Sequence, residues 1–293
     1  MEALLRSTIL LVGVVVPGDN IPGVRRDVAI QALLPKDAIV VDNDPHALPV
    51  VSPFAQHSIL HLAWSKGVPL YAVNRIKAPE TAGVIRTLGP HVGCVACFPR
   101  RVPPLLLKAS RRGFLNVHPS LLPDYRGPSP LFWQFRAGEQ RTGVTVHWMD
   151  AEFDTGPIAA QRAIPMPDGI TETDATAMMA RTGAQLLTQV LERVADGEIP
   201  YHKQAPGGSS QPYPQEADFS IDLDWSAQRI YNFMRATAIW GNPFTVEVDG
   251  ETYRLTEAIS WSPYGQLGQA MSMEGSNQVL LQCNPGVVLA RFG

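Results

Sequence analysis

The chain has 293 residues, of which 45% are hydrophobic and 17% are charged. This composition supplies enough apolar side chains for a buried core, which excludes a wholly disordered protein. The formal net charge of −3 excludes the strongly basic surface that is typical of proteins binding nucleic acid through overall charge.

The region 1–204 alternates between sequence patterns that are typical of helices and of strands. Residues 2–7 have the pattern of a helix end, and the apolar run Ile9–Val16 predicts a strand buried on both faces. Further helices are expected at 28–34, 58–66, 80–88, 103–111, 128–138 and 174–196, and further strands at 38–41, 68–73, 92–98, 113–118, 144–149 and 158–165. The alternation predicts an α/β fold with a mostly parallel sheet.

The C-terminal region has a different pattern. Residues 205–215 are rich in proline, glycine and serine, which predicts a linker between a domain at 1–204 and a smaller one at 216–293. The smaller domain is expected to contain a helix at 226–238 and strands at 244–248, 253–255, 279–281 and 287–290. Asp249-Gly250 predicts a hairpin turn, so we expect a small β-barrel-like domain with a leading helix.

The cysteines and the N-terminal residues indicate the cellular compartment of the protein. Cys94, Cys97 and Cys283 are too few for a disulfide framework and fit a reducing compartment. Cys94 and Cys97 have the spacing of a metal pair, but no second pair follows, so we interpret them as core residues and expect no metal site. No signal peptide or membrane-spanning run is recognisable, which leads us to expect a cytoplasmic protein without a membrane or DNA partner.

The strongest candidates for chemistry follow the apolar segment Gly113–Leu115. Alternate residues of a strand point to the same face, so Asn116 and His118 are expected side by side. They lie at the carboxyl end of a strand, where ligands bind in parallel α/β sheets. Asp154 lies downstream in an acidic loop that contains a glycine, residues 150–157.

Asn116, His118 and Asp154 together suit the transfer of an acyl group to an amine. An imidazole exchanges protons near neutral pH, and a neighbouring carboxylate favours its charged form. The asparagine amide can donate to a carbonyl oxygen that gains negative charge. Because no serine or cysteine occupies a nucleophile elbow, direct attack by the acceptor is expected. The residue types alone also permit a purely structural capped turn.

The longer run Asn116–Pro130 resembles the signature of the formyltransferases that use 10-formyltetrahydrofolate (10-formyl-THF). Gly143–Thr145 and Asp150–Pro157 are similar to the second motif of that family in both order and spacing. Asn116, His118 and Asp154 fall on the family's catalytic triad. The similarity runs through most of the chain, from the first helix into the C-terminal domain.

The resemblance implies a Rossmann-like sheet that binds the folate donor, with an acceptor amine attacking the formyl carbon. Asn116 and protonated His118 would stabilise the oxyanion, and Asp154 would keep His118 charged and help to position a water that relays protons. Two segments, 96–102 and 120–123, resemble elements that contact the folate. The folate-binding residues expected from them are Phe98, Arg100, Val102, Ser120, Leu121, Leu122 and Pro123.

The acceptor is less strongly indicated than the donor. The domain layout resembles that of the methionyl-tRNA formyltransferases, so initiator methionyl-tRNA is the first expectation. However, residues 216–293 contain four arginines, no lysine and nine acidic residues, a composition poorly suited to RNA phosphates. His147 is closer to family members with small acceptors. These two features favour an amino-sugar nucleotide as the alternative acceptor.

One further difference concerns the start of the sheet. The family's first strand, which is central in its sheet, has no counterpart in this sequence. We therefore expect a start that lies further upstream, a truncated sheet or a rearranged one. A truncated sheet would fit a non-catalytic folate-binding relative. The triad also permits hydrolysis of 10-formyl-THF, in which water replaces the amine.

Overall fold

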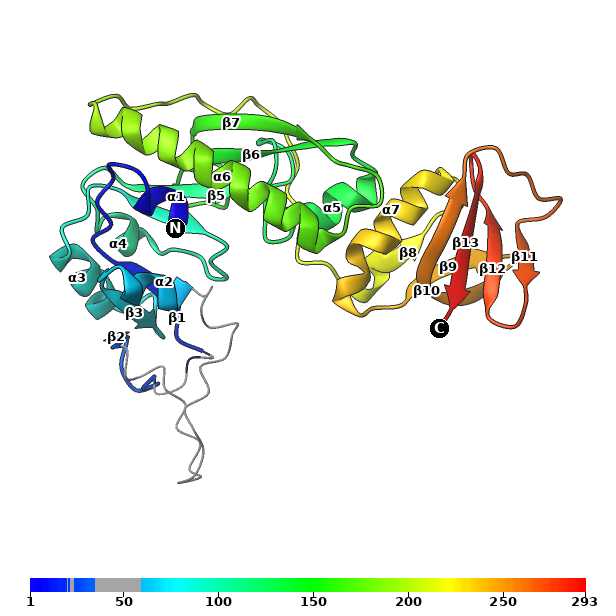
Figure 1. Cartoon of the computed structure of the whole chain (residues 1–293), viewed down its shortest axis with the longest axis horizontal. Helices are drawn as coiled ribbons and strands as arrows, with labels where there is room; N and C mark the ends of the chain where they lie inside the picture. The colour runs from blue at the N-terminus through cyan, green and yellow to red at the C-terminus, as the bar shows by residue number, and fades with distance from the viewer. Residues whose placement is uncertain (20, 22–23, 35–58) are drawn as a thin grey trace, which may run out of the picture. The chain divides into compact units, whose positions relative to one another are not determined.

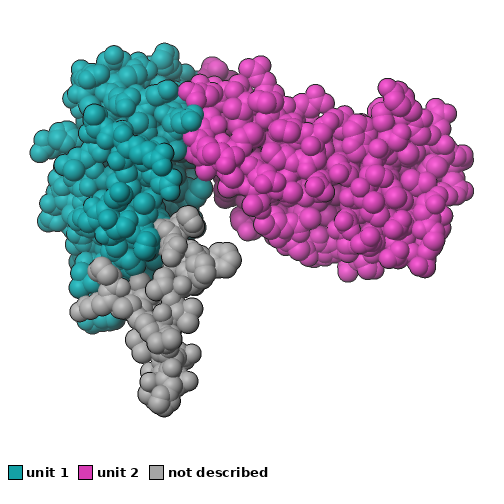
Figure 2. Space-filling model, viewed as in Figure 1, with its two compact units in different colours: residues 1–118, 145–160, 183–204 teal, residues 119–144, 161–182, 205–293 magenta. Residues whose placement is uncertain are grey.

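The computed structural model describes residues 1–19, 21, 24–34 and 59–293. The chain folds into two units, which Figure 2 shows in different colours. Unit 1 comprises residues 1–118, 145–160 and 183–204, and unit 2 comprises residues 119–144, 161–182 and 205–293. Unit 2 thus includes two segments from earlier in the chain, and the linear boundaries at residues 204 and 216 stay a prediction.

The strands that precede residue 166 form two sheets (Figure 1). One has the order β1-β3-β2 and the other the order β4-β5-β6-β7. The strands are β1 (Val14–Pro17), β2 (Ile30–Ala32), β3 (Leu70–Val73), β4 (Gly93–Ala96), β5 (Phe114–His118), β6 (Arg141–Trp148) and β7 (Ile158–Pro165). β1 is parallel to β3 and β4 is parallel to β5, whereas β2 and β6 pair antiparallel with β3 and β5. The α/β class is confirmed, and its sheets combine parallel and antiparallel pairs where a mostly parallel sheet was expected.

The helices begin and end where the sequence provides suitable residues. They are α1 (Glu2–Leu5), α2 (Ile59–Ser65), α3 (Pro79–Thr87), α4 (Pro104–Leu107), α5 (Pro130–Ala137), α6 (Glu172–Ala195) and α7 (Ala227–Thr237). α3, α4 and α5 each begin with proline, whose missing N–H needs no partner in the first turn. Gly138 ends α5 in a left-handed conformation, with φ of 77°.

The second half of α6 covers the strands that carry the candidate site. Leu186, Leu187, Val190, Leu191 and Val194 are buried on one face of the helix. The same cluster contains Leu115 of β5 and Val146 of β6, both fully buried. Each buried aliphatic side chain contributes roughly 1.5–3 kcal/mol through loss of apolar surface from water. This packing therefore holds β5 and β6 in a fixed register beneath the helix.

Three predictions about unit 1 were wrong. The strand expected at Ile9–Val16 is restricted to β1, and Leu10 is 83% exposed. The helix expected at 28–34 is replaced by β2, which pairs with β3. Cys94 and Cys97, expected in the core, are both exposed. The strand expected at 38–41 lies outside the described residues.

Unit 2 contains the C-terminal sheet, with strand order β11-β12-β13-β10-β9-β8 (Figure 1). Its strands are β8 (Ser220–Ile221), β9 (Phe244–Val248), β10 (Glu251–Ser262), β11 (Met271–Glu274), β12 (Gln278–Gln282) and β13 (Val287–Phe292). The predicted hairpin joins β9 to β10 through Asp249 and Gly250, both with positive φ. The sheet is open, with β11 and β8 at its edges, so the C-terminal sheet domain is confirmed but is not closed into a barrel.

Aromatic side chains form the centre of unit 2. Phe132 of α5, Phe219, Phe233 of α7 and Phe244 of β9 are all fully buried, and their ring centroids lie 5.1–6.4 Å apart. Edge-on and tilted ring contacts of this kind stabilise beyond the area that they bury. They tie α5, α7 and the C-terminal sheet into one hydrophobic core. Among the described residues, no helix is long and apolar enough to cross a membrane.

Replacing Leu186 by Ala removes a side chain that α6 packs into the core of unit 1, where it is 5% exposed. We expect the free energy of unfolding to fall by about 2–5 kcal/mol, because the cavity left behind only partly collapses. Urea denaturation measures the change. Glu192→Ala, at an exposed position of the same helix, is the control and should shift the free energy by no more than about 0.5 kcal/mol. Equal effects would contradict this packing.

Candidate active site

The candidate site lies at the end of β5 and on the neighbouring strand β6. In their antiparallel pairing, Asn116 lies opposite His147 and His118 lies opposite Thr145. The imidazoles of His118 and His147 are buried, at 3% and 1% exposure. Buried polar side chains need partners, because an unpaired polar group loses its hydrogen bonds to water.

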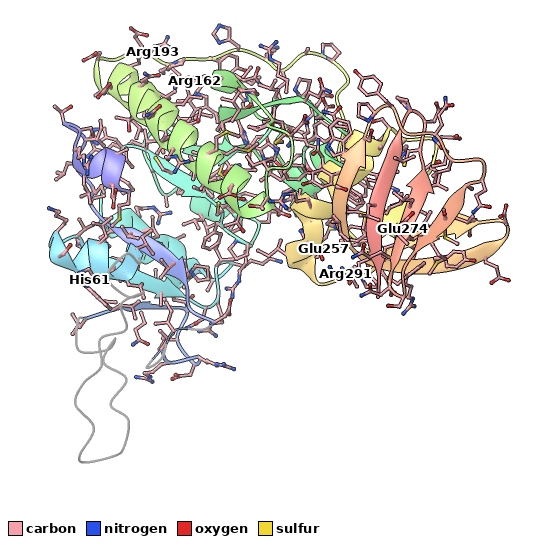
Figure 3. All side chains as sticks on the ribbon, turned by 45° about the vertical axis from the view of Figure 1, so that its right-hand side comes forward. His61, Arg162, Arg193, Glu257, Glu274 and Arg291 are labelled. Atoms are coloured by element: carbon pink, nitrogen blue, oxygen red, sulfur yellow. The ribbon has the colours of Figure 1, made fainter. Side chains whose placement is uncertain are left out.

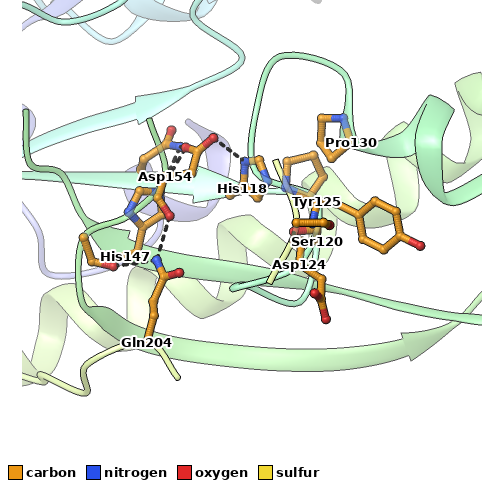
Figure 4. Close-up of polar contacts among 12 residues, drawn as sticks. His118, Ser120, Asp124, Tyr125, Pro130, His147, Asp154 and Gln204 are labelled. Carbon is orange, nitrogen blue, oxygen red and sulfur yellow. Dashed lines mark hydrogen bonds and ion pairs between the residues drawn. The ribbon is translucent and has the colours of Figure 1, made fainter. Parts of the chain in front are cut away.

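The carboxylate of Asp154 lies close to three side chains (Figure 4). Its Oδ1 lies 3.3 Å from Nδ2 of Asn116 and 3.4 Å from Nε2 of His147. Its Oδ2 lies 3.6 Å from Nδ1 of His118. The structure therefore brings together the three residues that the sequence singled out, although they come from two segments nearly forty positions apart.

His147 also belongs to this cluster. Its Nδ1 lies 3.1 Å from the carbonyl oxygen of Trp148, and its Nε2 lies 3.2 Å from the amide nitrogen of Asn116. When Nδ1 carries the proton, it donates to that carbonyl, and Nε2 accepts from Asn116. His147 and Asp154 thus fix the direction of the Asn116 amide. Sequence reasoning noted His147 only as a difference between family members.

With Nδ1 of His118 facing the carboxylate, Nε2 is the atom of this imidazole that can present a proton to a substrate. The amide nitrogen of Asn116 is directed toward Asp154 and His147. The arrangement can therefore provide hydrogen-bond donors to a developing negative charge, with the carboxylate stabilising a charged imidazole.

The loop that carries Asp154 is held in an unusual backbone conformation. Asp154 has a left-handed φ of 55°, a conformation that glycine, asparagine and aspartate adopt more readily than other residues. At Gly156, a Cβ atom would lie 1.8 Å from the carbonyl oxygen of Trp148, so only glycine fits against β6. Strained backbone persists where the surroundings fix it, and such positions cluster at functional sites.

Gln204 fixes this loop from a distant position in the sequence (Figure 4). Its side-chain nitrogen donates to the carbonyl oxygens of Asp154 and Gly156, at 2.6 and 2.8 Å. The loop is also closed internally, since the Thr155 hydroxyl donates to Asp150 at 2.9 Å. The sequence did not indicate a role for Gln204, because this residue directly precedes the predicted linker and belongs to no motif.

The predicted folate residues of unit 1 follow β4. Val102 is buried in the core beside Phe98, so both residues support the segment from within. The Arg100 guanidinium donates to the carbonyl oxygen of Asn74 at 2.8 Å and pairs with Asp19. It is therefore anchored to the chain just beyond β3. The folate contacts of this segment stay a prediction.

The predicted folate residues of unit 2 form the turn after β5. Ser120 and Leu122 are buried, and the Ser120 hydroxyl donates to the carbonyl oxygen of Asp124 at 2.7 Å. The Leu122–Pro123 peptide bond is cis. A Cβ at Gly143 would lie 2.3 Å from the Leu121 side chain, so the glycine of the second motif makes room for this turn. The turn is shaped by packing and hydrogen bonds, while its folate contacts stay a prediction.

A buried imidazole, an amide and a carboxylate at the carboxyl end of a strand are chemically suited to group transfer with proton exchange. Comparison with known proteins identifies the class. Residues 33–191 match the family model for formyl transferases. The chain is 30% identical over 226 residues to a methionyl-tRNA formyltransferase from Sorangium cellulosum, covering 76% of this chain and 72% of that protein. The chain belongs to the formyl transferase family and is a formyl-transfer enzyme.

Solved structures share the fold at lower sequence identity. An N-formyltransferase from Helicobacter canadensis matches with a TM-score of 0.57 and 19% identity, over 80% of this chain and 82% of that one. HypX from Aquifex aeolicus matches with a TM-score of 0.54 and 19% identity, over 78% of this chain and 41% of that one. The chain thus spans about two fifths of HypX. At these identities the likeness concerns the fold.

Gln204→Ala removes both hydrogen bonds to the Asp154 loop. We expect kcat for formyl transfer to fall by about tenfold or more, because the carboxylate is then less well positioned. KM should change little, since Gln204 would act through Asp154 rather than on a substrate. Lys203→Ala, at the exposed neighbouring position, is the control. An unchanged kcat in Gln204→Ala would contradict the positioning role.

Proposed function

We propose that this enzyme transfers the formyl group of 10-formyl-THF to the amino group of methionyl-tRNA. The observation that carries the acceptor is the similarity to methionyl-tRNA formyltransferases, which covers 76% of this chain at 30% identity. A relative from Chloroflexus aggregans bears the same name and is 35% identical over 184 residues, 62% of this chain and 60% of that protein. The geometry of Asn116, His118 and Asp154 supports the reaction type.

The folate donor is supported by two lines. The segments 96–102 and 120–123, which resemble folate-contacting elements, are both ordered by internal hydrogen bonds and packing. In addition, structures with the same fold were solved with folate compounds. HypX was crystallised with tetrahydrofolic acid, and the Helicobacter canadensis enzyme with folinic acid.

In the proposed reaction, the amine nitrogen attacks the formyl carbon, and the carbonyl electron pair moves onto its oxygen. His118 Nε2 donates to this oxyanion, and the Asn116 amide does so when it turns from Asp154 and His147 toward the substrate. Asp154 favours the charged imidazole through its carboxylate, 3.6 Å from Nδ1. The intermediate collapses as the C–N bond to the folate breaks. The amine then loses a proton and the folate nitrogen gains one, which balances the transfer.

An amino-sugar nucleotide is the second candidate acceptor, and the arginines of residues 216–293 favour it. Three of the four are held by protein groups. Arg229 stacks on Trp225 at 3.8 Å and donates to the carbonyl oxygen of Arg136. Arg235 donates to Gly169, and Arg291 pairs with Glu257 at 2.9 Å (Figure 3). The nine acidic residues of this region also outnumber its four arginines, so it offers little net positive charge for an RNA backbone.

The two acceptors can be distinguished in one assay. The enzyme is supplied with 10-formyl-THF and either methionyl-tRNA or an amino-sugar nucleotide, and formation of tetrahydrofolate is followed. We expect turnover with methionyl-tRNA, with an apparent affinity that falls steeply as salt increases, because phosphate contacts release counterions. Turnover with the sugar nucleotide alone would replace the proposed acceptor. Formate production without any amine would indicate hydrolysis.

His118→Ala should lower kcat for formyl transfer by about 10²–10⁴-fold, because it removes the proposed proton donor and oxyanion partner. Circular dichroism should show an intact fold. His202→Ala changes an exposed imidazole and should retain full activity. Full activity in His118→Ala would contradict the mechanism while leaving the family assignment unchanged.

A further inference from the structure

One arginine side chain connects the loop that carries Asp154 to the segment that follows β4. The Arg101 guanidinium donates a hydrogen bond to the carbonyl oxygen of Ala151. Its Nη2 lies 3.5 Å from Oε2 of Glu152, and its central carbon lies 5.2 Å from the ring centroid of Phe153. A single side chain thus contacts the three consecutive residues that directly precede Asp154.

Residues 151–153 form the exposed middle of this loop, and the Phe153 side chain is 56% exposed. The end of the loop is held more firmly, since Gln204 donates to the carbonyl oxygens of Asp154 and Gly156. Segments with few buried contacts open locally at a low cost in free energy. A contact to the middle of the loop can therefore determine how often the Asp154 carboxylate leaves its partners.

A guanidinium is suited to this contact by its charge and its shape. A hydrogen bond from a charged donor is stronger than one between neutral groups, and a planar cation stacks well on an aromatic ring. The ion pair with Glu152 contributes less, because the side chains of Arg101 and Glu152 are 47% and 74% exposed. The bond to Ala151 and the contact with Phe153 are therefore the stronger parts of the connection.

Arg101 lies in the segment 96–102, which resembles a folate-contacting element of the family. The preceding side chain, Arg100, contacts a different part of unit 1, since it donates to the carbonyl oxygen of Asn74 at 2.8 Å. Two consecutive arginines thus join this segment to the chain beyond β3 and to the Asp154 loop. A shift of the segment moves Arg101 and, through it, the loop.

We propose that Arg101 is a positioning residue that couples the donor-binding segment to the carboxylate of Asp154. The proposal rests on the proposed function, which assigns residues 96–102 to the folate donor and Asp154 to the reaction. Folate bound to this segment holds Arg101 in place, and Arg101 holds residues 151–153, so that Asp154 stays beside His118. By thermodynamic linkage, the ordered loop in turn strengthens binding of the donor.

Limited proteolysis with chymotrypsin tests the contact without an acceptor. Cleavage after Phe153 requires the loop to open, so its rate reports the population of the open loop. Arg101→Met keeps a long apolar side chain and removes the charged donor, and it should speed this cleavage by about tenfold. Arg101→Lys retains a charged donor and should restore most of the protection. Arg86→Met removes an exposed guanidinium from α3 and should leave the rate unchanged.

The same cleavage measures the coupling to the donor when folinic acid is added. Folinic acid should slow cleavage after Phe153 by about fivefold or more in the chain with Arg101. In Arg101→Met it should have no effect on this cleavage, because the segment and the loop are no longer joined.

Steady-state kinetics distinguish positioning from a general loss of structure. With the acceptor that the enzyme uses, Arg101→Met should lower kcat by about tenfold and raise KM for 10-formyl-THF by about fivefold, because the coupling acts on both. Gln204→Ala should change kcat alone, since Gln204 holds only the far end of the loop. Arg101→Lys should recover most of both losses. Tm of each Arg101 variant should stay within about 2 °C, as for other exposed positions.

Three results would overturn the proposal. The first is cleavage after Phe153 at the same rate in Arg101→Met as in the chain with Arg101. The second is equal slowing of cleavage by folinic acid in both chains. The third is faster cleavage in Arg101→Met with unchanged kcat and KM, which would show that the contact orders the loop without a role in transfer. Failure of the chain with Arg101 to bind folinic acid would instead contradict the proposed function, and the coupling with it, whatever the cleavage rates without ligand.

Discussion

The geometry of the candidate site depends on the carboxylate of Asp154, which lies against Asn116, His118 and His147. A carboxylate in a largely buried site is costly unless several partners compensate it. Here the Asn116 amide donates to it at 3.3 Å, and Nδ1 of His118 lies 3.6 Å away. These partners are buried polar side chains that themselves need hydrogen-bond partners. The side chains of the cluster therefore hold one another in place. Loss of one member leaves the others buried with fewer partners.

The remainder of unit 1 maintains this contact. The register of β5 against β6 places Asn116 opposite His147, and the buried face of α6 packs over both strands. On the other side, Gly156 allows the loop to approach β6 closely, and Gln204 bonds the loop carbonyls. The left-handed backbone at Asp154 is tolerated because these contacts fix it. The fold thereby turns two separate sequence motifs into one site.

Local sequence patterns were sufficient for the residues whose role is fixed by neighbours in the chain. Asn116 and His118 could be placed on one strand face by alternation, whereas Asp154 was assigned through the resemblance of its loop to the second motif of the family. The β9–β10 hairpin followed from Asp249-Gly250. Gln204 could not be found in this way, because its contacts are with residues about fifty positions away. The conformation of Asp154 likewise depends on packing and has no sequence signal of its own.

The errors also have physical causes. The apolar run Ile9–Val16 has the composition of a central strand, but a strand also needs paired neighbours. β1 has one partner strand among the described residues, so only the part beside β3 is extended. Cys94 was expected in the core because no second cysteine pair suggested a metal site, and it instead borders a cavity. The apolar sequence pattern thus indicates which residues can form a buried strand. Whether they do so also depends on a neighbouring strand with which to pair.

The central claim is that Asp154 and His118 act as one unit in formyl transfer. A double-mutant cycle tests it most directly, with single-turnover rates measured for Asp154→Asn, His118→Ala and the double variant. If the two residues act together, the double variant should be about as slow as His118→Ala alone, because the carboxylate has no imidazole left to stabilise. Rate losses that multiply in the double variant would contradict the claim and show that the two side chains contribute independently.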